Sequence, residues 1–235
     1  MLCSQSKSTK YCSHDIFEPI TVRKTVKPIK RTAQTERTVK NSDKEDNAKA
    51  KETKESKSIN QILYRNRILT IIGEINQKTT KTTVEQLLAL SSESDEPITL
   101  LLSSPGGHVE SGDSIYDLIR FIRAPVKIVG TGWVGSIAIL IFLAADKKHR
   151  YCLPNTRFLI HQPSGGILGD ASDISIQADE LIKIRKRINR IIAERTGKTQ
   201  KQVNSDTERD YWMSATESLK YGLVGSIITS IDELS

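Results

Sequence analysis

The chain has 235 residues and a mass of 26.3 kDa, which predicts one domain or one domain with a tail. Charged residues make up 27% and hydrophobic residues 37%, a composition that excludes a membrane bundle and a fully disordered chain. The net charge at pH 7 is +7, so binding to nucleic acid or to another anionic surface is a first hypothesis.

The excess positive charge lies in the first quarter of the chain. Residues 1–57 contain 14 Lys and Arg against 8 Asp and Glu, whereas residues 58–235 contain 21 against 20. Residues 1–57 also have too little apolar surface to offset the entropy cost of ordering. We expect a disordered basic N-terminal arm at 1–57, a pro-segment or targeting segment, and a folded domain at 58–235. The expected location is the cytoplasm, or the plastid or mitochondrial matrix if the arm is a transit peptide.

The first half of the folded part alternates strand and helix patterns. Short β-branched or fully apolar runs predict strands at 67–73, 98–102 and 126–129. Apolar residues at helical spacing predict helices at 83–90 and 115–123.

A glycine-rich turn is expected next, at 130–135, followed by an apolar helix that begins at Ser136. The remaining patterns predict, in order, a strand at 158–160, a long helix at 172–196 that stops at Gly197, a short helix that begins with the capping box Ser214–Glu217, and a strand at 223–228. This alternation predicts an α/β fold with mostly parallel strands.

The three cysteines, Cys3, Cys12 and Cys152, are odd in number and widely spaced, which predicts no disulfide framework. Cys3, Cys12 and His14 could be imagined as metal ligands, but a fourth ligand at a recognised spacing is missing, so we expect no metal site. The longest apolar run, 137–145, falls short of the roughly 20 residues that span a bilayer, so we expect no membrane segment.

The first candidate for chemistry is Ser136, which follows the glycine-rich segment. Ligands of α/β folds bind in crevices at the carboxyl ends of strands. A serine at a helix N-terminus lies beside free N–H groups in a positive field, which would favour a developing oxyanion. Serine is also a common N-cap residue, so the local pattern fits either a nucleophile or a simple helix cap.

Two further candidates also lie at strand ends. The glycines of Ser104-Pro-Gly-Gly107 would let the backbone approach a ligand closely, or would form an ordinary turn. His161 closes an apolar strand as a general base would, although a structural histidine fits the same pattern. Local pattern alone does not single out Asp210, which lies in the charged run 206–210.

Several long motifs follow one another along residues 66–232. They are Ser104-Pro-Gly-Gly107, Ser114-Ile-Tyr-Asp117, Cys152-Leu-Pro-Asn155, Ile160-His-Gln-Pro163, Gly169-Asp-Ala-Ser-Asp-Ile174, Asp206-Thr-Glu-Arg-Asp210 and Tyr221-Gly-Leu-Val224. In these motifs the chain closely resembles the proteolytic subunit of the Clp protease, the ClpP family. The resemblance implies the α/β ClpP/crotonase-like fold of repeated β-β-α-type units, with a protruding strand–helix handle at 165–195.

The resemblance also implies a catalytic site. The family's nucleophilic serine precedes the histidine of Ile-His-Gln-Pro by 25 residues, as Ser136 precedes His161. The matching acid is Asp210, and backbone N–H groups of Gly107 and Ile137 would form the oxyanion hole. The implied activity is that of a serine endopeptidase, the proteolytic subunit of an ATP-dependent Clp protease.

The chain departs from the family pattern beside the nucleophile and at the partner clefts. Trp133 and Val134 are bulkier than the family's usual residues, so we expect different packing behind the serine. Thr99 and Leu101 replace an aromatic pair in the clefts that receive loops of the partner unfoldase, whereas Phe121 is kept. The family's axial-loop segment is not recognisable in the arm.

The resemblance implies heptameric rings stacked in pairs, a tetradecamer of this chain alone or with paralogous subunits. Unfolded proteins and peptides would reach the enclosed sites through an AAA+ unfoldase such as ClpX or ClpA/ClpC. The chain has no Gly-x-x-x-x-Gly-Lys-Ser/Thr loop, so we expect no bound ATP and no other cofactor.

The main alternative is a non-catalytic or regulatory ring subunit of a mixed assembly. A nucleic-acid-binding arm on a crotonase-like body is disfavoured, because the arm lacks aromatic interleaving and a recognised binding module. The triad and the handle likewise disfavour an acyl-CoA enzyme of the same fold. We therefore expect no nucleic-acid partner.

Overall fold

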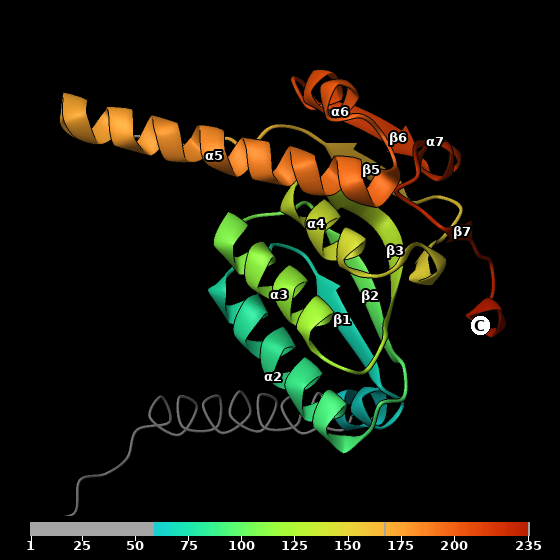
Figure 1. Cartoon of the computed structure of the whole chain (residues 1–235). Helices are drawn as coiled ribbons and strands as arrows, with labels where there is room; N and C mark the ends of the chain where they lie inside the picture. The colour runs from blue at the N-terminus through green and yellow to red at the C-terminus, as the bar shows by residue number, and fades with distance from the viewer. Residues whose placement is uncertain (1–58, 167, 235) are drawn as a thin grey trace, which may run out of the picture. The chain divides into compact units, whose positions relative to one another are not determined.

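A computed structural model of the chain describes residues 59–166 and 168–234, all within the compact unit Thr53–Ser235 (Figure 1). The proposed arm at 1–57 and the imagined ligands Cys3, Cys12 and His14 lie outside these residues, so the disordered arm stays a prediction. No helix in the described part is long and apolar enough to cross a membrane. Nor do these residues contain a group of three or more side chains that could hold a metal ion.

The described strands form one seven-stranded sheet. They are β1 (Ile68–Ile72), β2 (Ile98–Ser104), β3 (Val126–Gly135), β4 (Arg150–Cys152), β5 (Arg157–Ile160), β6 (Tyr211–Ser214) and β7 (Ser226–Ile227). The order β1-β2-β3-β4-β7 is parallel throughout, β5 is parallel to β3, and β6 is antiparallel to β5. The predicted α/β fold with mostly parallel strands is confirmed.

The sheet forks at β3, and this fork positions the site. Ile128–Gly130 of β3 pair with β4, whereas Trp133–Gly135 pair with β5. The predicted turn at 130–135 is therefore wrong, because the glycines lie in a strand whose backbone finds partners on β5 and, at Val134, on β2. The sequence pattern missed β4 and β6, which are too short to show a period.

Three helices cover one face of the sheet, as Figure 1 shows. They are α2 (Gln77–Glu93), α3 (Val109–Phe121) and α4 (Ile137–Ala144). Every residue of α4 is buried, so this helix forms the centre of the apolar core. The other helical segments are residues 59–65, α5 (Ala171–Thr196), α6 (Gln200–Asp206), α7 (Ala215–Tyr221) and the 3-10 turns η1 (Lys147–His149) and η2 (Ile231–Glu233).

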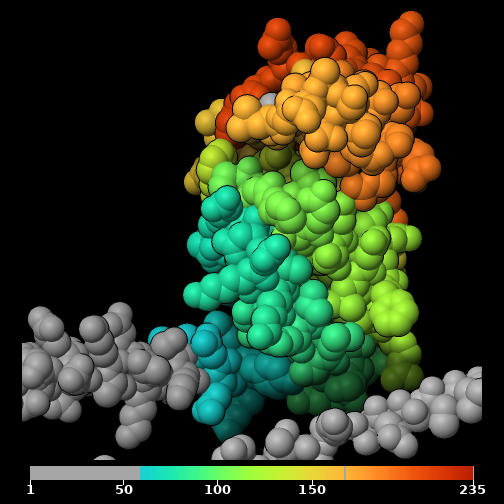
Figure 2. All heavy atoms as spheres, turned by 90° about the vertical axis from the view of Figure 1, so that its left-hand side faces the viewer, coloured from blue at the N-terminus to red at the C-terminus, as the bar shows by residue number. Residues whose placement is uncertain are grey.

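Helix α5 confirms the predicted long helix and its stop at Gly197, which adopts a left-handed conformation. Its buried residues, Ile188, Asn189, Ile192 and Ala193, all lie in the C-terminal third. The N-terminal turns project past the rest of the described residues (Figure 1), and Figure 2 looks at this side of the molecule, with α5 above α2 and α3.

The strand expected in the handle is not formed at 161–166 or 168–170. A β-strand needs a hydrogen-bonded neighbour, and none of the described strands pairs with this segment. The capping box at Ser214–Glu217 is confirmed: the Ser214 hydroxyl accepts from the Glu217 N–H, and the Glu217 carboxylate accepts from the Ser214 N–H.

Candidate active site

The topology brings three sequence-distant side chains to one edge of the sheet. Ser136 follows β3, His161 follows β5, and Asp210 precedes β6. Because β5 lies between β3 and β6, and β6 runs in the opposite direction, two strand ends and one strand start meet there. The sequence expectation that these three residues lie together agrees with this arrangement.

The imidazole of His161 is bound to Asp210. Its Nδ1 lies 3.0 Å from Asp210 Oδ1, and the side chains are 26% and 63% exposed. A carboxylate only accepts hydrogen bonds, so Nδ1 carries a hydrogen and donates this hydrogen bond to Asp210 Oδ1. The other ring nitrogen, Nε2, is then free to accept a proton, which is the state a general base requires.

The backbone of Ser136 holds its side chain at a sharp strand-to-helix turn. The residue has a φ of 55° and a ψ of −128°, one of two non-glycine residues with positive φ in the described part of the chain. Its N–H donates to the Leu159 carbonyl at 3.0 Å, and its own carbonyl accepts from Ile139. Residues other than glycine rarely adopt such a backbone conformation, and strained residues of this kind cluster at active sites.

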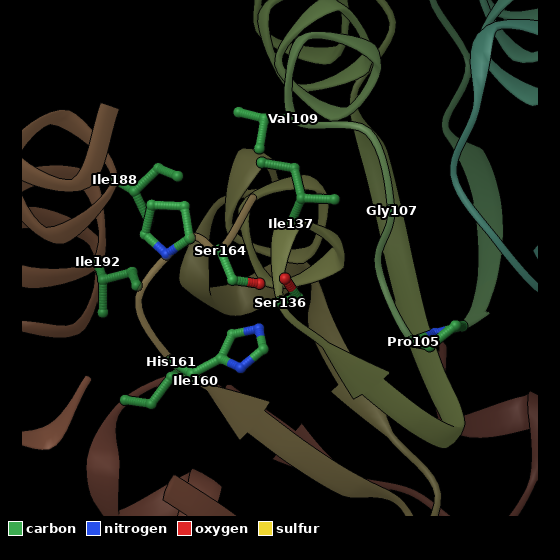
Figure 3. A pocket seen from close by; sticks show the side chains of 11 residues that line it. Pro105, Gly107, Val109, Ser136, Ile137, Ile160, His161, Ser164, Ile188 and Ile192 are labelled. Carbon is green, nitrogen blue, oxygen red and sulfur yellow. The ribbon is translucent and has the colours of Figure 1, made fainter. Parts of the chain in front are cut away.

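Ser136 and His161 line the same cavity, of about 240 Å³, and Figure 3 shows the hydroxyl and the imidazole facing it together. Among the described residues the Ser136 hydroxyl takes part in no hydrogen bond. Catalytic contacts of this kind often tighten only when a substrate is bound. The serine is therefore placed for attack on a group that enters the cavity.

Backbone N–H groups converge beside the serine. The segment 106–108 forms a parallel bridge with Ile75, in which the Ile75 N–H donates to Gly106 O and the His108 N–H donates to Ile75 O. This bridge leaves the Gly107 N–H unused. Ile137 is the first residue of α4, where helical N–H groups lack intrahelical acceptors. Gly107 and Ile137 thus fit the expected oxyanion hole.

Gly106 is a residue that the sequence reasoning did not single out. Its φ is +103°, and a Cβ there would lie 2.6 Å from Ser136 Cβ and 3.2 Å from the Ile137 nitrogen. Only glycine can bring this loop so close to both the serine and a donor of the hole. The double glycine in the motif was the available signal, but it did not show which glycine faces the serine.

We expect Gly106→Ala to lower kcat for peptide hydrolysis by about 10²- to 10³-fold, the loss seen when one oxyanion donor is removed from a hydrolase. The added methyl would displace Ser136 or Ile137. Steady-state kinetics on a short chromogenic peptide measures this loss.

Two glycine variants serve as controls for that measurement. Gly73→Ala places alanine at an equally left-handed φ of +92° with no atom within 4 Å, and Gly166→Ala meets neither a neighbour nor a positive φ. Both should keep kcat within a few-fold of wild type. A Gly106→Ala enzyme as active as the Gly73→Ala enzyme would remove Gly106 from the site.

The cavity is mostly apolar. Its described lining is Pro105, Gly107, Val109, Ser136, Ile137, Ile160, His161, Pro163, Ser164, Ile188 and Ile192. Helix α5 contributes Ile188 and Ile192 as one wall, seen opposite Val109 and Ile137 in Figure 3. His161 is the one ionisable side chain in this lining, so the cavity suits an uncharged, apolar side chain.

A buried polar network holds the loop that carries Asp210. Asn189 of α5 is fully buried and donates to the Thr207 hydroxyl at 3.0 Å, while the Thr207 carbonyl accepts from the Gln162 N–H at 2.7 Å. The loop on which Asp210 lies is thereby tied to the residue after His161. Asn189 interrupts the apolar stripe of its helix, and that interruption was the signal available in the sequence.

The bulky residues beside the nucleophile take separate places. Val134 is fully buried in the core, whereas Trp133 is 39% exposed and points away from it. The expectation of packing that differs from the family's behind the serine therefore rests on Val134 and stays a prediction. Burial raises the pKa of Cys152 to about 12, so this thiol does not compete as a nucleophile.

An apolar groove lies elsewhere on the sheet, away from the catalytic cavity. Its lining includes Thr99 and Leu101 of β2, Val129 of β3, and Leu234, and its volume is about 420 Å³. Phe121, at the end of α3, is 81% exposed. The two substituted cleft positions thus line a groove although neither is aromatic.

Comparison with known proteins gives consistent matches. The family model described as Clp protease matches residues 49–231. The chain is 51% identical over 188 residues to ATP-dependent Clp protease proteolytic subunit 3 of Rhizobium etli, covering 80% of this chain and 97% of the relative. It is 54% identical over 164 residues to an ATP-dependent Clp protease proteolytic subunit of Paracoccus denitrificans, covering 70% and 82%. The solved structure of ClpP1 from Listeria monocytogenes matches with a TM-score of 0.69 at 48% identity, over 75% of this chain and 99% of that one.

Proposed function

The chain belongs to the Clp protease family, and from that membership we propose that Ser136, His161 and Asp210 are its catalytic triad. It has the ClpP fold, and it is a serine endopeptidase, the proteolytic subunit of a Clp protease. The observation that supports the triad best is the convergence of a strained Ser136 with the His161–Asp210 pair around one cavity.

The geometry gives each residue a distinct role in this proposal. Nε2 of His161 removes the proton from Ser136 Oγ as that oxygen attacks the scissile carbonyl carbon. The N–H groups of Gly107 and Ile137 stabilise the resulting oxyanion. His161 then gives the proton to the leaving amine, and Asp210 stabilises the positive ring throughout. His161 next removes a proton from a water molecule as the water oxygen attacks the acyl carbon, and it returns that proton to Ser136 Oγ as the bond between Oγ and the acyl group breaks.

The names of the relatives support a proposal for the partners of the chain. We propose that the chain assembles into stacked heptameric rings, alone or with paralogous subunits, and receives protein substrates from an AAA+ ATPase. We place the apolar groove at Thr99 and Leu101 at the contact with that ATPase, and we keep the cytoplasm as the proposed location. ATP would be used by the partner, because the chain lacks a phosphate-binding loop.

The alternative of a non-catalytic ring subunit is not favoured. The named relatives are proteolytic subunits, and all three proposed catalytic side chains are present. Trp133 and Val134, the bulky residues that favour this alternative, take separate places: Trp133 is 39% exposed and stacks on Trp212, whereas Val134 is buried in the core.

The proposed function is tested by peptide hydrolysis with the purified full chain, without ATP and with EDTA present. Peptides with Leu on the carbonyl side of the scissile bond should be cleaved at least about tenfold faster than matched Asn peptides, because the apolar cavity leaves an amide unsatisfied. A rate that disappears with EDTA would contradict a cofactor-free triad. Equal rates for Leu and Asn peptides would show that the cavity does not hold this side chain.

A further inference from the structure

Two tryptophans and one arginine form a stack across the three strands that carry the proposed triad. The rings of Trp133 and Trp212 are nearly parallel, at 5°, with centroids 5.9 Å apart. The guanidinium carbon of Arg157 lies 4.4 Å from the centre of the Trp212 ring. We call these three residues the Trp stack.

Each member of the Trp stack belongs to a different catalytic strand. Trp133 lies on β3, three residues before Ser136, and Arg157 lies on β5, four residues before His161. Trp212 lies on β6, two residues after Asp210. Trp133 pairs with Arg157 and Trp212 pairs with Leu159, so all three side chains emerge on one face of the sheet.

The stack spans a gap that backbone pairing does not close. Neighbouring strands lie about 4.8 Å apart, so β3 and β6, on either side of β5, are two such spacings apart. Only large side chains can meet across the middle strand, and Trp133 and Trp212 do so. β6 is an edge strand of four residues whose one strand partner is β5, so it gains little positional restraint from the ladder alone.

We propose that the Trp stack is a positioning device for the catalytic triad: it fixes the spacing of β3, β5 and β6 and thereby the reach from Asp210 through His161 to Ser136. The three residues act through the strands and touch no reacting atom. This inference rests on the proposed function, because it concerns the geometry of that same triad.

Backbone contacts couple the positions of these strands to the positions of the catalytic residues. Leu159 lies on the same face as the Trp stack, and its carbonyl accepts the Ser136 N–H. On β6, the pairing of Tyr211 with Ile160 sets the distance between Asp210 and His161, the residues next to this pair. A shift of β6 by 1 Å would therefore lengthen the 3.0 Å contact between the acid and the base.

The test measures kcat and KM for a short peptide with Trp133→Ala, Trp212→Ala and the double variant. A displacement of about 1 Å in a catalytic site costs up to roughly a hundredfold, so we expect kcat to fall about ten- to a hundredfold with KM nearly unchanged. Because both rings serve one contact, the double variant should be no slower than the slower single variant. Trp133→Phe should recover most of the lost rate.

A control variant and a measurement of the assembly show whether a loss of rate comes from the Trp stack. Arg120→Ala removes a comparable cation–π contact, to Tyr116 on α3, and should leave kcat unchanged. Unchanged kcat in both tryptophan variants, independent losses that multiply in the double variant, or a change in KM alone would overturn the inference. Loss of the wild-type assembly in native mass spectrometry would overturn it too, by assigning the stack to a subunit contact.

The wild-type rate separates failure of this inference from failure of the proposed function. An active wild type with equally active variants contradicts the Trp stack alone. A folded wild type that cleaves no peptide and does not react with a fluorophosphonate contradicts the triad, and the positioning inference with it.

Discussion

Replacing Ser136 by alanine is expected to abolish peptide cleavage, with a loss in kcat on the order of 10⁶-fold, as in other serine hydrolases that lose the nucleophile. The substitution removes the oxygen that would form the acyl intermediate and leaves His161 and Asp210 in place. Alanine fits within the space of the serine, and its backbone has no greater steric conflict at the Ser136 φ of 55°. Steady-state hydrolysis of a short peptide by the purified assembly measures the loss.

Stability should hardly change in this variant, because the Ser136 hydroxyl makes no hydrogen bond within the described residues. The matched control is Ser164→Ala, since Ser164 is the other serine that lines the same cavity. It should keep kcat within a few-fold of wild type. A Ser136→Ala protein that is folded, assembled and nearly as active as wild type would refute Ser136 as the nucleophile.

Asp210→Asn is expected to lower kcat by about 10⁴-fold while KM changes little, by analogy with the same substitution in another serine protease. An amide at this position can donate to Nδ1 of His161. The imidazole would then carry its proton on Nε2, where it can no longer accept one from Ser136. The 3.0 Å contact itself survives, so the loss would come from the wrong tautomer and not from lost geometry.

Glu208→Gln is the control for the acid, because Glu208 lies on the same loop but its carboxylate binds Arg185 and not the imidazole. Its activity should match wild type. If Asp210→Asn were no slower than Glu208→Gln, the contact between Asp210 and His161 would have no part in catalysis. The two variants together separate the charge of the loop from the identity of the acid.

Periodicity in the sequence was enough to predict the main helices and parallel strands. The apolar stripe of α5 and the capping box at Ser214 are local signals, since each depends on residues close together in the chain. The prediction of a turn at 130–135 was wrong because the structure of this segment depends on residues far away in the chain. This segment forms a strand because Gly130 finds partners on β2 and β4 and residues 133–135 find partners on β5, and no local pattern shows such distant pairing.

The catalytic residues, too, could be predicted from local sequence only in part. Ser136 and His161 stand out locally at the ends of apolar strands, whereas Asp210 was found only through the family resemblance. Its place depends on the antiparallel pairing of β6 with β5, which local sequence does not encode. The roles of Asn189 and Gly106 also arise from tertiary packing, so the interrupted stripe and the double glycine in the sequence did not reveal what these residues contact.

Reaction of the full chain with a fluorophosphonate, followed by peptide mapping in a mass spectrometer, shows whether Ser136 is a nucleophile activated by His161. We expect one adduct, on Ser136, that forms in the wild type and is lost or strongly slowed in His161→Ala. An adduct on any other residue, or equal labelling of Ser136 without His161, would contradict it.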